Sequence, residues 1–399
     1  MTEFEMVLFE LIRAAASGSP REIPATVDQV ALYRTVRRLH LASLLWDSAS
    51  RLPASPVRDA WEKERDAAAL KDLMQTEEKE TVDRALSEAG IRFLYLKGSV
   101  LKSLWGDPSF RYMGDADFLY EGDDHALKRA LEGVGYAAVE FVSRDYSHHH
   151  IFKKEPWFIL EPHYALFNSD DPFADTLAGI FDRATPDPAL PGRYLISVED
   201  LYLHCLFHLR KHIAGGGIGV RSFLDFAFLL RAYPDLPERE RVVDVLSRCG
   251  LSGFEERVLR IARLLSDPSL SPDEEDEAEL CALFKTGLFG SLGNKFANQA
   301  QTERGRSRFP RLRVFLRHVF PPLVSLAKKK FRAPLSWLLY PFFWFRRFFL
   351  ILFSPVRRKR TGNAVRVLKS KDSEDGGREL RYFGLIQGSG DAKGGERRE

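Results

Sequence analysis

The chain has 399 residues, of which 45% are hydrophobic and 29% are charged, and its formal net charge is +3. This composition is ordinary for a globular protein, and the length allows two packed units with appendages. The three cysteines (Cys205, Cys249 and Cys281) are far apart and fit no metal or redox spacing, which excludes a disulfide framework and indicates a reducing compartment.

The charge is distributed unevenly along the chain. Residues 306–360 contain fifteen Lys or Arg and no Asp or Glu. The rest of the chain therefore has a net charge of −12, which brings the total to +3. This asymmetry predicts an anionic partner for the basic segment. Glu3, Glu5 and Glu10 interrupt the first apolar residues, which a secretory signal would not allow. We therefore expect a cytoplasmic protein, peripheral on the inner membrane face if the basic segment binds lipid.

Periodicity predicts helical regions on both sides of an α+β core with a mixed sheet. Residues 1–90 are expected to be helical, with a long charged helix that begins at Pro56 and ends near Gly90. The core, 91–168, alternates strand and helix patterns: strands at 91–96, 115–120, 136–142, 149–153 and 157–163, and helices at 99–105 and 123–133. The following parts are a loop at 168–192, a helical domain at 193–305, a basic aromatic amphipathic segment at 306–360 and a disordered tail at 361–399.

Two short motifs in the core carry the chemistry. Asp115 and Asp117 should point to one face of a strand, because strand side chains alternate. Gly98 lets a backbone approach a phosphate closely, Ser99 adds a hydroxyl, and the expected helix offers its first N–H groups. Each motif alone also fits a plain turn or a solvated strand edge. Together they suit magnesium beside a nucleotide phosphate, which predicts phosphoryl or nucleotidyl transfer.

Glu161 is the candidate for a third carboxylate. It interrupts an apolar strand, where a lone carboxylate is unfavourable unless it is paired or binds a metal. The alternative is a position on the solvent face of an edge strand, which Pro162 would permit.

These residues resemble a known signature. The run Lys97-Gly98-Ser99, Arg111 and Gly114-Asp115-Ala116-Asp117-Phe118 is similar to that of the DNA polymerase β-like nucleotidyltransferase superfamily. More narrowly, it resembles a family of bacterial nucleotidyltransferases with a Lys-Gly … Arg-x-x-(Gly/Ala)-Asp-(Ile)-Asp core. An Asp-x-His strand of that family matches 161–164, and its helical block matches 203–212 and 221–225. The resemblance covers about residues 30–240, and Glu161 and Ala116 stand where the family has an aspartate and a larger aliphatic residue.

The resemblance implies a nucleotidyltransferase-like mixed sheet and a role for each matching residue. Asp115, Asp117 and Glu161 would be the catalytic residues and the ligands of two Mg²⁺ ions, with Mn²⁺ as the alternative metal. Glu161 would also help to deprotonate the acceptor. Four more residues would bind the nucleotide: Gly98 and Ser99 would hold its β- and γ-phosphates, while Lys97 and Arg111 either neutralise them or form structural ion pairs.

The expected activity is the transfer of a nucleoside monophosphate from an NTP, with ATP foremost, to a hydroxyl or phosphate of a small molecule, glycan or protein, with release of pyrophosphate. An adenylyltransferase of the aminoglycoside-modifying sort is one alternative. Another is a non-catalytic nucleotide-binding protein that docks to a membrane or partner through residues 306–360. A nucleic-acid acceptor ranks lower. The basic aromatic stretch could contact phosphates and bases, but the acidic body offers no positively charged surface that continues it.

The histidine run 148–150 could suggest a transition metal. Strand alternation would place His148 and His150 on one face and His149 on the other, leaving two convergent imidazoles. A satisfied or exposed histidine strand is therefore favoured. His163 shares its strand face with Glu161, so it either orients that carboxylate or lies in a core.

Five further polar residues follow the core: His204, His208, Lys211, Arg221 and Asp225. The first three recur on one helix face. The group either lines the acceptor side of the cleft or forms a polar face packed between subdomains.

The aromatic stretch 335–353 is interrupted by Pro341 and by Arg346 and Arg347, which argues against a helix that spans a membrane. Basic clusters flank the stretch and fit an element lying on an anionic membrane. A helix docked on the acidic body is the alternative.

Overall fold

The structure is a computed structural model, and it divides the chain into two compact units. One comprises residues 1–208 and 220–284, and the other comprises 209–219 and 285–399. The residues described are 1–286 without 142, 145, 146, 168–170 and 172, the isolated positions 298, 309, 312–314, 316, 345, 349 and 353, and the stretch 378–386.

The basic aromatic segment 306–360 and the tail 361–399 lie almost entirely outside the described residues, and so does the predicted membrane element 335–353. Within the expected tail, the structure describes a short helix, α19 (Arg378–Tyr382). Among the helices of the described residues, none combines the length and the apolar character that crossing a membrane requires.

The N-terminal part of the chain is helical, as its periodicity predicts. It comprises α1 (Glu3–Ala16), α2 (Gln29–Arg38), α3 (Trp46–Ala49) and α4 (Pro56–Glu88). Side chains accept hydrogen bonds at three of the four helix starts: Thr2 in a capping box, Asp28, and Ser55 followed by a proline in the first turn. These caps explain why the helices begin where they do.

A mixed sheet of seven strands confirms the α+β class. Its spatial order is β3-β4-β5-β2-β1-β7-β6. β2 lies antiparallel to β1 and parallel to β5. The bounds are β1 (Arg92–Tyr95), β2 (Ala116–Glu121), β3 (Ala137–Glu140), β4 (Ile151–Lys154), β5 (Phe158–His163), β6 (Thr185–Pro186) and β7 (Arg193–Leu195). The last two were not expected, since they lie in or directly after the predicted loop, and β7 pairs parallel with β1.

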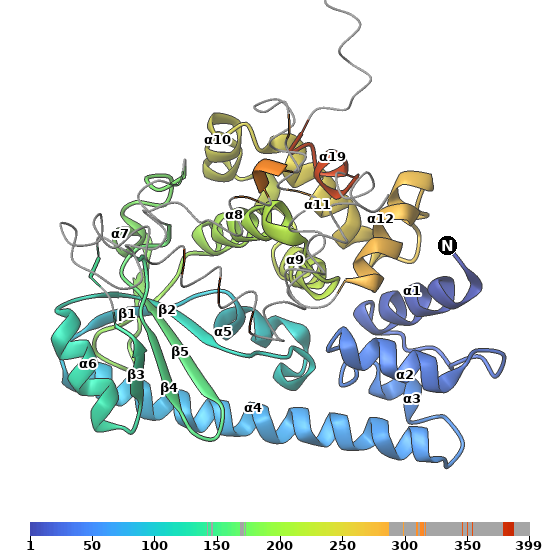
Figure 1. Cartoon of the computed structure of the whole chain (residues 1–399), viewed down its shortest axis with the longest axis horizontal. Helices are drawn as coiled ribbons and strands as arrows, with labels where there is room; N and C mark the ends of the chain where they lie inside the picture. Colours follow the sequence, from blue (N-terminus) through green and yellow to red (C-terminus); the bar gives the residue numbers. More distant parts are fainter. Residues whose placement is uncertain are drawn as a thin grey trace, which may run out of the picture. The chain divides into compact units, whose positions relative to one another are not determined.

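Helices α4 and α6 (Asp124–Gly133) cover one face of the sheet (Figure 1). Alternate strand residues such as Phe93, Phe118 and Tyr120 form a fully buried core there with Val82 and Leu86 of α4. The opposite face carries a smaller apolar cluster at one end, formed by Leu94, Leu96, Leu119, Ile180 and Phe181. Its other end carries the polar side chains described below.

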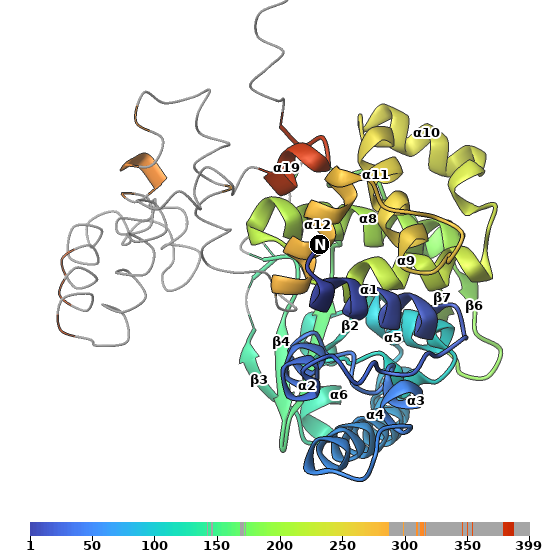
Figure 2. The same cartoon turned by 90° about the vertical axis from the view of Figure 1, so that its right-hand side faces the viewer.

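The predicted helix at 99–105 is divided into α5 (Gly98–Leu101) and the 3-10 turn η1 (Lys102–Trp105), and a second 3-10 turn, η2 (Pro108–Phe110), follows. Five helices follow β7 among the described residues: α8 (Val198–Gly216), α9 (Arg221–Ala232), α10 (Glu240–Arg248), α11 (Ser252–Leu264) and α12 (Glu274–Lys285). The amino group of Met1 lies 2.6 Å from Glu277, so α1 packs beside α12 (Figure 2).

Candidate functional site

The site begins at the turn that leaves β1. Lys97 adopts φ 42° and ψ −117°, a conformation that few residues other than glycine adopt, and it directly precedes α5. The Leu96 N–H donates to the carbonyl of Asp117 at 3.0 Å, which ties the turn to β2. The Lys97 ammonium lies 3.1 Å from the Asp117 carboxylate. The strained turn thus points a cation at the second aspartate of the motif.

Asp117 and Glu161 face each other in register on the neighbouring parallel strands β2 and β5. Side chains at one register position of paired strands share a face, so the two carboxylates converge. The ligand atoms of Asp117, Glu161 and His163 lie within 4.8 Å of one another. Such a set of two carboxylates and an imidazole fits one divalent cation.

Asp115 lies just before β2, on the same side as Asp117, but it does not belong to that compact group. It is nevertheless close to it: burial, and then the negative charge of Asp117, raise the pKa of Asp115. The structure therefore brings Asp117 and Glu161 together directly and places Asp115 within electrostatic reach.

Asp117 has the opposite electrostatic environment. Burial alone would raise its pKa, but the Lys97 ammonium and a hydrogen bond with His163 hold the pKa of Asp117 well below its usual range. The Nε2 atom of His163 is 2.9 Å from the Asp117 carboxylate. His163 is buried and contacts Asp117, a partner that the sequence did not indicate.

Arg111 forms a buried ion pair. Its Nε and Nη2 atoms donate to the two carboxylate oxygens of Asp225 on α9, at 2.6 and 2.8 Å. The Trp105 indole donates to the same aspartate at 3.0 Å. Of the two roles that the sequence left open for Arg111, the structure contains the ion pair.

The third nitrogen of the Arg111 guanidinium lies against Gly98. A Cβ at Gly98 would be 2.6 Å from Arg111 Nη1, so a larger residue would displace the guanidinium that Asp225 holds in place. Gly98 therefore allows the Arg111 guanidinium to lie close to the backbone. An anion beside Gly98 would meet Nη1, because the other two nitrogens are bound to Asp225.

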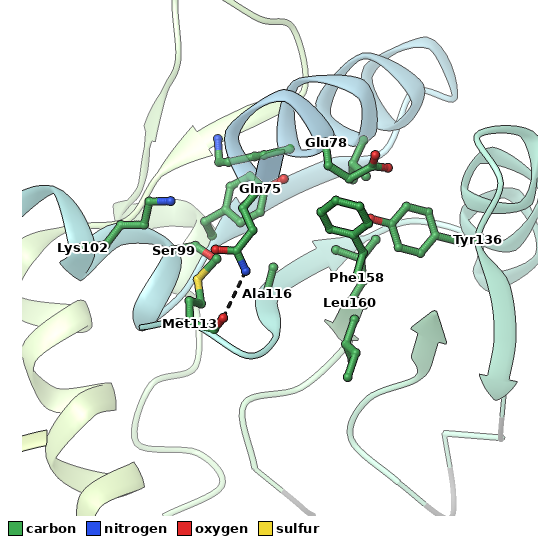
Figure 3. Close-up of a pocket in the computed structure, with 13 residues that line it drawn as sticks. Gln75, Glu78, Ser99, Lys102, Met113, Ala116, Tyr136, Phe158 and Leu160 are labelled. Atoms are coloured by element: carbon green, nitrogen blue, oxygen red, sulfur yellow. Dashed lines mark hydrogen bonds between the residues drawn. The ribbon is translucent and has the colours of Figure 1, made fainter. Parts of the chain in front are cut away.

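Ser99 turns its side chain toward the other face of the sheet. Its hydroxyl contacts the Met113 sulfur at 3.7 Å and lines a cavity of about 40 Å³ between the sheet and α4 (Figure 3). Gln75 crosses this cavity and donates to the Met113 carbonyl at 3.1 Å. The volume suffices for a few water molecules and not for a nucleotide. The Ser99 N–H is bound to the Leu96 carbonyl at 3.2 Å.

A second arginine approaches the aspartates from α9. Arg221 donates to the Tyr112 carbonyl, and Asp115 is among the carboxylates that act on it. Burial, reinforced by the charge of Arg111, lowers the pKa of Arg221 to about 9. His208 of α8 is close enough to Asp117 to lower the pKa of that aspartate. Both were candidates for the acceptor side, and both lie near the acidic group.

The histidine run is arranged differently from the predicted alternation. His148 and His149 converge with His163, and His150 points away and stacks on Phe141. The reason is that regular strand geometry begins only at Ile151, since His149 forms no more than an isolated bridge with His163. The expectation that His148 and His150 share a face was therefore wrong.

A family model described as an uncharacterised nucleotidyltransferase matches residues 25–267. The match includes the strands, the acidic group and the helices that contribute Arg221 and Asp225. No curated protein matches the chain. No solved structure matches it either.

Proposed function

The chain belongs to this uncharacterised nucleotidyltransferase family, and from that premise we propose that it transfers a nucleoside monophosphate from an NTP to an acceptor hydroxyl or phosphate, releasing pyrophosphate. The observation that carries the proposal is the register pairing of Asp117 with Glu161 on parallel strands. ATP is the proposed donor, and a small molecule, a glycan or a protein is the proposed acceptor. We propose the cytoplasm as the place of reaction.

Asp115, Asp117 and Glu161 would hold two Mg²⁺ ions, or Mn²⁺ in their place. The fit rests on hard carboxylate oxygens that converge within 4.8 Å, with the third carboxylate close enough to sense the charge of Asp117. Bound ions of this kind neutralise the phosphates and clamp the attacking and leaving oxygens. A divalent ion would also favour the charged form of Asp115, which its surroundings otherwise disfavour.

Lys97 has two partners in this scheme. Its ammonium, 3.1 Å from Asp117, compensates the carboxylate while no cation is bound. A cation on Asp117 would release the ammonium toward the nucleotide phosphates. Lys97 would then keep the pocket close to neutral in both states.

The phosphates would lie beside Gly98, where Arg111 Nη1 offers a donor. Because Asp225 holds the rest of the guanidinium, the donor is pre-positioned. Ser99 stays a candidate through its place at the start of α5, although its hydroxyl faces Met113. Glu161 would accept the proton of the acceptor hydroxyl.

The test compares substitutions of the two aspartates with a matched change on the same strand. Asp115→Asn and Asp117→Asn are each expected to lower pyrophosphate release from labelled NTPs, with a divalent cation and cell extract present, by at least about 10²–10³-fold. Glu121→Gln, at the exposed far end of β2, should leave the rate unchanged.

Undiminished turnover in the Asp115→Asn/Asp117→Asn double variant would refute the assignment. A wild-type chain that binds NTP but releases no pyrophosphate with any extract would instead support the non-catalytic binding protein.

A further inference from the structure

Three histidines form a compact group at the edge of the acidic site. The ligand nitrogens of His148, His149 and His163 lie within 4.8 Å of one another. Their ring centroids are separated by 4.6, 5.4 and 5.0 Å. His148 and His163 are only 8% and 3% exposed and His149 is half-buried, so the group is not a solvated surface patch.

The backbone holds the two halves of this group together. His149 bridges His163 in antiparallel fashion, and the Tyr164 N–H donates to the His148 carbonyl at 3.1 Å. The His150 N–H donates to the Pro162 carbonyl at 2.9 Å, on the other side of the bridge. Backbone hydrogen bonds on both sides of the bridge thus hold the histidines beside one another without a bound ion.

The donor set differs from that of the neighbouring acidic group. Imidazole nitrogens suit zinc, copper, cobalt or nickel, whereas carboxylates and water suit magnesium and calcium. Three histidines with an open fourth position are a known zinc arrangement. An aliphatic cluster would fill the same buried space without burying polar nitrogens, so packing alone does not explain the choice of three histidines.

The contact between His163 and Asp117 has the form that metal-bound histidines need. A ligating histidine usually donates its second ring N–H to a carboxylate, which fixes the tautomer and the orientation of the ring. The Nε2 atom of His163 lies 2.9 Å from Asp117, so Nδ1 is the nitrogen that would face a metal.

We propose that His148, His149 and His163 form a binding site for a transition-metal ion of the Zn²⁺ or Co²⁺ class, next to the oxygen-rich site of Asp117 and Glu161. The Asp117–His163 hydrogen bond joins the two sites. The proposal concerns metal binding and does not require transfer activity.

The experiment titrates the full chain, stripped with a chelator, with Co²⁺ alone, using visible absorption and competition with a chromophoric chelator. The tightest-bound equivalent is expected to show the spectrum of a low-coordinate nitrogen site, distinct from Co²⁺ held by the neighbouring carboxylate oxygens. His148→Ala and His149→Ala should each weaken binding at least about tenfold. His125→Ala, an exposed histidine on α6, is the matched control and should bind as the wild type does.

Wild-type affinity in both His148→Ala and His149→Ala would overturn the proposal. If these variants do not fold, X-ray absorption of the Zn²⁺-loaded wild type tests whether the histidines bind the ion. Three imidazole nitrogens at about 2.0–2.1 Å would support the site, and an oxygen-only shell would overturn it.

Asp115→Asn separates the two proposals, since Asp115 lies outside the histidine group. This variant should lose transfer and keep the Co²⁺ spectrum. A chain without transfer activity that still shows the histidine-dependent spectrum would contradict only the proposed function.

Discussion

The two faces of the central sheet are built from alternate residues of the same strands, and they differ in kind. On β2, Phe118 and Tyr120 point to the face under α4 and α6 and are fully buried among aromatic and aliphatic side chains. Asp117, between Ala116 and Phe118, points to the opposite face and meets an ammonium and an imidazole. One face is held together by apolar packing, while the other is held by interactions between charged and polar groups.

Residues that stabilise the fold and residues that carry the chemistry therefore alternate along one strand. Because the strand period is two, a change at one position affects packing and a change at the next affects electrostatics. Substitutions at neighbouring positions on and just before β2 should therefore differ in kind, with a loss of packing at Phe118 and an altered dependence of stability on pH at the aspartates.

Phe118→Ala should lower the free energy of unfolding by about 3–5 kcal/mol, because it opens a cavity in the fully buried face. Denaturant unfolding followed by circular dichroism measures this loss. Val139→Ala, on an exposed position of β3, is the control and should change stability by no more than about 0.5 kcal/mol. Equal effects of the two substitutions would mean that this face does not carry the core.

Asp117 should make the wild type sensitive to acid. Since Lys97 and His163 hold its pKa well below the ordinary value, the carboxylate stabilises the folded state above about pH 4, the unfolded value, and this stabilisation is lost as the pH falls toward the folded pKa.

The test measures the free energy of unfolding between about pH 5 and pH 2 in the wild type and in Asp117→Asn. The variant should be less stable at neutral pH and should lose less stability on acidification. If stability depended on pH in the same way in both proteins, another group would cause the sensitivity to acid.

Asp115→Asn should raise the thermal midpoint of the metal-free protein while it abolishes transfer. Burial and the charge of Asp117 raise the pKa of Asp115, so its ionised form at neutral pH destabilises the fold, and a neutral amide removes that penalty. A gain of about 0.5–2 kcal/mol is typical of a single stabilising substitution. Calorimetry at pH 7 measures it, and a lower midpoint would contradict the predicted sign.

Local patterns were sufficient to predict the strands that carry the acidic residues. Alternation on 115–120 and the apolar run at 157–163 correspond to β2 and β5, and the helical spacing before Gly90 corresponds to α4. These signals persist over many residues and do not depend on distant partners. The mixed sheet followed from them.

Features that depend on distant partners were not predictable. The Arg111–Asp225 ion pair joins residues 114 positions apart, and no local signal indicates that a guanidinium would lie over Gly98. β7 is three residues long and is defined by its pairing with β1. The grouping of His148 with His149 depends on irregular backbone before Ile151, where the alternation rule does not apply.

The long helix α4 is shared between two cores. Near its start, Trp61 is completely buried and its indole donates to the Ala42 carbonyl of the N-terminal helices at 2.8 Å. Near its end, Val82 and Leu86 complete the aromatic face of the sheet (Figure 1). With 33 residues it is about 50 Å long, and it reaches both places as a single rod. A fragment that began at residue 91 would expose part of that aromatic face to solvent. We therefore expect the strands to aggregate when they are expressed without α4.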